Sequence, residues 1–211
     1  MDVAEMITII DDHGFEDKTS ASKMEKINDT LWDVCGREPW YFLESTNTSL
    51  TIDSTGKITS PTSISKITSL IDTSNNRVLE PIEHDTLVQM YPSRITETGY
   101  PKLYYQTAGD FYVWPIPDAT YTYHLKYMRL HPELTSSDVE SAIYLPARHH
   151  RVLVLGALSK MYAEDDDPEL AAAYDEMFEI RYANMREDLW KWNYDMDQVM
   201  VDVDMEPYWT V

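Results

Sequence analysis

The chain has 211 residues, of which 43% are hydrophobic, so it can bury a sizeable core and is not intrinsically disordered. Its formal net charge of −20 argues against tight binding to free nucleic acid or to an anionic membrane, because both need clustered Lys and Arg. The single cysteine, Cys35, excludes a disulfide framework within the chain, and no apolar run approaches the roughly 20 residues of a membrane span. We expect a soluble protein made in a reducing cytoplasm.

The N-terminal segment predicts two helices. The first begins with a pattern like a capping box from Asp2 to Glu5, and Gly14 is its expected C-terminal stop. The second begins with a capping box at residues 22–25 and ends at Gly36. Both have apolar residues at spacings of three and four, which is typical of a helix with one buried face.

The central segment changes to short strands rich in Thr, Ser and aromatic residues. Residues 49–60 predict two strands joined by a turn, and residues 63–72 have the alternation of a half-buried strand. Asn75 and Asn76 indicate another turn, with a short strand after it. One or two helical turns are expected before Pro92, and the last three strands are expected at residues 103–107, 111–114 and 122–130.

Two further helices are predicted after the strands. The third begins near Pro146, and its segment 151–162 is apolar nearly all round, which indicates burial on several sides. The fourth has Asp167 as N-cap and Pro168 as first residue, and would span residues 168–192. Its apolar stripe consists of Leu170, Tyr174, Met177, Phe178, Met185, Leu189 and Trp192.

The predicted fold class is therefore α+β: a helical bundle with an inserted small antiparallel β domain and an extended C-terminal arm. The bundle comprises residues 1–44 and 133–190, the β domain residues 45–132, and the C-terminal arm residues 191–211. Alternating valines favour an extended arm, and its aromatic residues favour docking on a partner over a frayed end. The expected anchors in and beside the arm are Trp190, Trp192, Tyr194, Val199, Val201, Val203, Tyr208 and Trp209.

The acidic runs allow several chemical interpretations. Paired carboxylates at Asp11–Asp12, Glu16–Asp17 or Asp165–Asp167 would suit general acid–base chemistry or a glycosidase, and residues 165–169 suggest calcium only weakly because the EF-hand spacing is missing. Solvated helix caps explain these runs more simply. We expect His149 and His150 at the surface, and no catalytic residue, metal site or cofactor.

The aromatic sheet leaves two interpretations open. Its rings would form a platform for sugars or single-stranded nucleic acid, or they would build the core and contact faces of a small sheet. Alternation places Tyr121, Tyr123 and Tyr127 on one face with Leu125, which favours the core for that strand. We predict a contact surface at Tyr104, Tyr112 and Trp114.

The order of the motifs resembles the head–tail adaptor family of tailed bacteriophages, also called head-completion, connector or tail tubular A proteins. The matching pieces span roughly residues 78–186: the Gly-x-Pro-x-x-Tyr-Tyr of residues 99–105, the Pro-x-Pro-Asp of residues 115–118, Leu145-Pro146, the buried "VLVLGAL", and the acidic break before "AAAYDEMFE". The acidic, aromatic C-terminal arm departs from the family pattern.

The resemblance implies a structural virion protein of the neck and not an enzyme. It implies a homo-oligomeric ring, usually of twelve copies, that binds the portal protein on one side and a tail or nozzle protein on the other. DNA would pass through the ring without sequence-specific binding, and we expect the C-terminal arm to dock on the portal. The alternatives are a carbohydrate-binding module of a phage tail or cell-wall-acting protein, and a cell-wall glycosidase.

Overall fold

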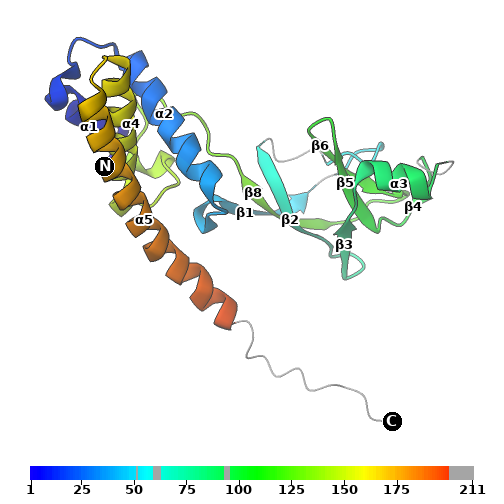
Figure 1. Cartoon of the computed structure of the whole chain (residues 1–211). Helices are drawn as coiled ribbons and strands as arrows, with labels where there is room; N and C mark the ends of the chain where they lie inside the picture. The colour runs from blue at the N-terminus through cyan, green and yellow to red at the C-terminus, as the bar shows by residue number, and fades with distance from the viewer. Residues whose placement is uncertain (51, 59–62, 93–95, 200–211) are drawn as a thin grey trace. The chain divides into compact units, whose positions relative to one another are not determined.

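The structure, a computed structural model, describes residues 1–50, 52–58, 63–92 and 96–199, the last ten of these as backbone only. It divides into two compact units (Figure 1). The helical unit contains Met1–Phe42 and the chain from His131 onward, and the β unit is Leu43–Leu130. Helices in one unit and a mainly antiparallel sheet in the other confirm the predicted α+β class.

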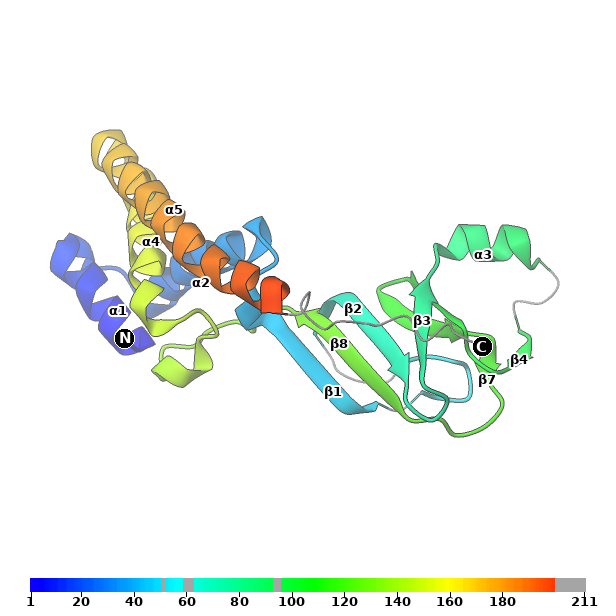
Figure 2. The same cartoon turned by 90° about the horizontal axis from the view of Figure 1, so that it is seen from below.

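The helical unit is built around one apolar helix. Helix α4 (Arg151–Glu164) contacts α1 (Val3–Ile10), α2 (Ser20–Arg37) and α5 (Pro168–Val199), which surround it (Figures 1 and 2). Residues 152–158 of α4 are all buried, as the apolar sequence predicts. Shorter helical turns lie at Asp11–Phe15, Tyr41–Leu43, Glu140–Ala142 and Ala147–His149.

The close approach of these helices depends on Gly156. A Cβ added there would lie 2.4 Å from Thr30 Cγ2 of α2 and 3.1 Å from Phe178 Cδ2 of α5. Neither distance leaves room for a methyl group, so α2 and α5 pack directly against the backbone of α4 at this point.

Side-chain caps fix the helix starts. In α1 the Asp2 carboxylate accepts from Glu5 N at 2.8 Å, while Glu5 accepts from Asp2 N at 2.9 Å, which confirms the predicted capping box. Asp167 accepts from Leu170 N at 3.0 Å and caps α5, as predicted. Helix α2 begins at Ser20, earlier than predicted. Its N-cap is Thr19, which has an extended backbone and whose hydroxyl accepts a hydrogen bond from Ser22 N at 3.2 Å.

Helix α5 runs to Val199, so the extended conformation predicted for residues 191–199 is wrong. Residues 169–199 contain no Gly or Pro, so no helix-breaking residue interrupts the helix over this range. Its 32 residues give a helix about 48 Å long at 1.5 Å per residue. The rest of the C-terminal arm, including Val201, Val203, Tyr208 and Trp209, lies outside the described residues.

The buried face of α5 consists of Phe178, Tyr182, Met185 and Leu189. Leu170 and Met177, which were expected on this face, are 40% and 50% exposed. At 100° per residue, they lie about 90–110° round the helix from the centre of the buried side chains. The predicted stripe therefore combined two different faces.

The β unit is a six-stranded curled sheet with the order β1-β8-β2-β3-β5-β6. Neighbouring strands are antiparallel except β3 and β5, and Glu44 of β1 pairs with Met128 of β8, so the two ends of the unit lie side by side. The strands of this sheet are β1 (Glu44–Leu50), β2 (Ile64–Asp72), β3 (Arg77–Pro81), β5 (Leu103–Thr107), β6 (Asp110–Trp114) and β8 (Tyr123–Arg129). A separate pair is formed by β4 (Thr98–Gly99) and β7 (Ile116–Pro117). The β unit also contains the short helix α3 (His84–Met90).

A short hairpin joins the two edges of the sheet. Ile52 bridges Ile58, and Ile58 N donates to Phe111 O of β6 at 2.9 Å. Val113 N of β6 donates to Gly56 O at 2.9 Å, and a Cβ on Gly56 would lie 2.9 Å from Val113 O. The curled sheet encloses a core of Leu50, Ile58, Ile67, Leu70, Leu79, Tyr104, Phe111, Val113, Tyr123, Leu125 and Tyr127.

Candidate interaction surfaces

Two of the three residues predicted as a β contact surface are buried. Tyr104 is 8% exposed and points into the core opposite Val113, and Trp114 is 7% exposed because Tyr91 stacks on it at 4.4 Å. The alternation of β5 and β6 thus puts Tyr104 on the inner face, and the C-terminal end of α3 covers Trp114. Only Tyr112 is partly accessible, stacked on Tyr105 at 5.5 Å.

The aromatic residues mostly build the sheet. Tyr123, Leu125 and Tyr127 of β8 are buried, as their alternation predicts, whereas Tyr121, before the strand, is only partly buried against the same core. One partly exposed aromatic group consists of Tyr105, Tyr112 and the imidazole of His84, which lies 5.3 Å from the Tyr105 ring. A second consists of Tyr100 and Tyr121, whose rings lie 5.6 Å apart. Because most of the rings fill the core, the sheet offers little area for an extended sugar platform.

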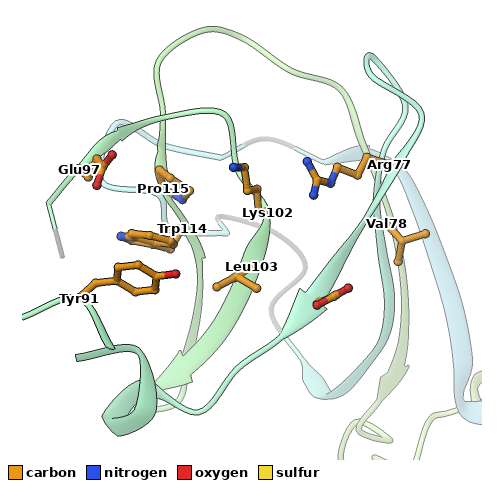
Figure 3. Close-up of a pocket in the computed structure, with 9 residues that line it drawn as sticks. Arg77, Val78, Tyr91, Glu97, Lys102, Leu103, Trp114 and Pro115 are labelled. Carbon is orange, nitrogen blue, oxygen red and sulfur yellow. The ribbon is translucent and has the colours of Figure 1, made fainter. Parts of the chain in front are cut away.

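A pocket of about 410 Å³ lies between β3 and the start of β5 (Figure 3). The stacked Tyr91 and Trp114 form one side, and Arg77 of β3 lies on the other side beyond Lys102 and Leu103 (Figure 3). Glu80, Glu97, Val78 and Pro115 complete the lining. Two cationic and two anionic side chains make the lining neutral overall. The sequence gives no sign of this site, because its charged residues come from three separate segments.

The helical unit exposes large apolar side chains that sequence reasoning missed. Trp32 of α2 is 47% exposed, and on α5 Leu170, Met177 and Ile180 are 40%, 50% and 57% exposed. The angular positions of the side chains round each helix indicate this exposure. Trp32 lies 100° round α2 from the buried Leu31, and Ile180 lies about 160° round α5 from the buried Phe178. Such side chains on one face of a helix are typical of an interaction surface.

Acidic residues from the runs, and Glu164 beside one of them, form ion pairs within the helical unit. Asp165 pairs with Lys18 at 2.8 Å, Glu164 pairs with Lys26 at 2.9 Å, and Asp11 pairs with Lys23. Among the residues that the structure describes, no group of His, Cys, Asp and Glu side chains is placed to hold a metal ion. Burial raises the pKa of the Cys35 thiol to about 12, so it stays protonated and unreactive at neutral pH.

The two adjacent histidines are not at the surface. His150 is fully buried, and both of its ring nitrogens lie 2.7 Å from carbonyl oxygens, those of Met1 and Leu145. His149 is 8% exposed, and its Nε2 accepts from Arg148 Nε at 3.1 Å beside the Asp188 carboxylate. The surface prediction was wrong because both side chains serve as hydrogen-bonding contacts within the fold.

The structure describes the backbone of four of the eight residues predicted as anchors in and beside the C-terminal arm. Trp190, Trp192, Tyr194 and Val199 lie on the last turns of α5, and the other four lie outside the described residues. None of the helices in the described segments is long and apolar enough to cross a membrane.

Comparison with known proteins supports one family. The sequence model of the family described as SU10 adaptor protein matches residues 1–202. This match confirms the resemblance to phage head–tail adaptors predicted from residues 78–186, and it extends the likeness to the N-terminal helices and into the C-terminal arm. No curated protein matches the chain.

Proposed function

The chain belongs to the SU10 adaptor protein family, a family of phage head–tail adaptors, and on this premise we propose that it forms a ring between the portal and the tail. The observation that supports the proposal most directly is the family match, because it covers both units. The ring is proposed to contain twelve copies, with a tail or nozzle protein on the side away from the portal. The protein would then be part of the virion neck.

The charge suits a passage for DNA. Twelve copies of a chain with a net charge of −20 would carry about −240 in total. If part of that charge lines the bore, it repels the phosphate backbone, and DNA passes without being held.

The C-terminal arm, residues 191–211, is proposed to dock on the portal. Its first nine residues belong to α5, in which Leu189, two residues before the arm, is buried. The arm would present Trp192, Tyr194, Tyr208 and Trp209 as anchors, and aromatic residues are the side chains most often enriched in interfaces.

Deletion of residues 191–211 is expected to abolish portal binding and leave the bundle folded, because Phe178 to Leu189 still pack on α4. Circular dichroism checks the fold, and co-purification with the portal checks binding. A matched full-length variant with Tyr208→Ala and Trp209→Ala keeps the acidic residues, and it separates the effect of the aromatic anchors from that of charge. Unchanged portal affinity of the truncated chain would refute docking through the arm.

The proposed function itself is tested by co-expression with the portal protein and electron microscopy of the purified complex. A ring of this chain on the portal is the expected result. Free portals beside a monodisperse monomer would argue against the adaptor role, and a glycan-binding screen would then test the alternative.

A further inference from the structure

Two exposed apolar surfaces belong to the helical unit. The first, the Trp32 face, consists of Trp32 with its exposed neighbour Gly36 one turn later on α2. The second, the α5 stripe, consists of Leu170, Ala173, Met177 and Ile180, all exposed. At 100° per residue these four α5 positions fall within an arc of about 80°, so they form one continuous stripe.

The contact between α2 and α5 shows which way each surface faces. Arg37 of α2 forms an ion pair with Glu179 of α5 at 2.8 Å. The Arg37 guanidinium also lies over the rings of Phe178 and Tyr182 on α5. On α2, Trp32 lies about 140° round the helix from Arg37. The Trp32 face therefore turns away from α5.

On α5, the four stripe positions lie about 100–180° round the helix from Glu179. The α5 stripe therefore turns away from α2. Because α2 and α5 both pack on α4, the two apolar surfaces lie on opposite flanks of one compact unit.

The placement of the Trp32 face and the α5 stripe on opposite flanks favours another copy of the same chain as the partner. A surface that is complementary to a different surface on the same molecule makes a head-to-tail contact, and repetition of that contact gives a closed ring when the rotation closes. Trp is one of the side chains enriched near the centres of interfaces, and methionine sulfur packs well on aromatic rings.

One charged residue beside each surface is opposite in sign to one beside the other. Glu25 lies seven residues before Trp32 on the same side of α2, is exposed, and lies 3.5 Å from Lys26 Nζ. Arg181 lies at the edge of the α5 stripe and is exposed, with no ion pair among the residues that the structure describes.

We propose that the Trp32 face of one copy packs against the α5 stripe of the next copy. This inference rests on the proposed ring, and it assigns the helical unit, rather than the β unit, as the source of the contact between neighbours. Each copy contributes Trp32 to one neighbour and Met177 and Ile180 to the other.

Complementation of two variants tests this directly. Trp32→Ala keeps the α5 stripe, and Ile180→Asp keeps the Trp32 face. Each variant alone should fail to form rings with the portal, since every contact in it lacks one half. Mixed together, they retain one intact contact per pair and should form heterodimers that grow no further, as seen by native mass spectrometry.

Cross-linking gives an independent readout in the intact assembly. In a Cys35→Ala background, Gly36→Cys combined with Asn184→Cys places one thiol beside each surface without altering Trp32, Met177 or Ile180. A short bismaleimide should convert the portal-bound full-length protein into a ladder of covalent multimers. The control pair, Gly36→Cys with Ser65→Cys on the β unit, should give no ladder.

The outcomes separate this inference from the proposed function. A ring on the portal without the ladder would leave the adaptor role standing and overturn the assigned interface. Covalent dimers that grow no further would also overturn it, because they indicate a symmetric contact. Absence of both the ladder and the portal complex would refute the interface and the ring together.

Discussion

At the residue scale, Gly156 sets how closely the helices pack. Gly156→Ala should lower the free energy of unfolding by about 1–3 kcal/mol, because the new methyl group would meet Thr30 Cγ2 at 2.4 Å within a closely packed core. Gly36→Ala is the matched control on α2: nothing lies within 4 Å of its Cβ position, and alanine should stabilise the helix by about 1 kcal/mol. Urea unfolding measures both. Adding Thr30→Ser, which removes the clashing methyl, should recover part of the loss.

His149 makes stability depend on pH. Burial and the positive charge of Arg148 lower the pKa of His149, although Asp188 opposes the change. Between the ordinary value of about 6.5 and the lower folded value, the unfolded chain binds a proton that the folded protein does not. The free energy of unfolding should therefore fall as pH decreases through this window, by less than about 1.4 kcal/mol per pH unit for this one group.

The comparison that isolates this effect is wild type against His149→Gln, with unfolding measured from pH 8 to pH 5. Other titrating groups contribute equally to both proteins, so the difference between their curves reports His149. Parallel curves would show that His149 does not resist protonation in the folded state.

At the scale of the element, α5 carries two methionines with opposite roles. Met185→Ala should cost about 2–5 kcal/mol, since Met185 is fully buried and its loss leaves a cavity against α4. Met177→Ala should change stability by less than about 0.5 kcal/mol, because half of that side chain is in solvent. Thermal unfolding at low protein concentration measures both in the monomer. Equal losses would mean that Met177 is covered within the chain.

Local signals in the sequence predicted much of the element pattern. The capping box at Asp2, the Asp167–Pro168 start and the apolar segment of α4 each depend on neighbouring residues, and each is confirmed. The end of α5 was missed, because alternating valines suggest an extended chain while the absence of Gly and Pro lets the helix continue. The face of Leu170 and Met177 was missed as well, because burial depends on where α2 and α4 lie.

The same limit applies to the candidate surfaces. Composition alone favours Tyr104 and Trp114 as contact residues, but which side of a strand faces the core depends on register and on α3. The pocket of Arg77 and Lys102 needs the parallel pairing of β3 with β5, which no local pattern indicates.

At the scale of the whole molecule, charge should govern assembly. Copies that each carry a net charge of −20 repel one another. Salt screens this repulsion, because the Debye length shortens from about 30 Å at 0.01 M salt to about 8 Å at 0.15 M. Ring formation should therefore become stronger as sodium chloride rises over this range, the reverse of phosphate binding. Analytical ultracentrifugation of the portal complex tests this. Dissociation with rising salt would show that ion pairs between copies outweigh the repulsion.

The pairing of Glu44 with Met128 has a consequence for how such proteins diversify. The β unit enters and leaves through neighbouring antiparallel strands, so its two connections are as close as those of a single hairpin. A different module whose first and last strands pair in the same way would meet the same junctions without disturbing Phe42 or His131. Recombination between phages at these two points would exchange the β unit as a cassette, while the helical unit keeps its own contacts.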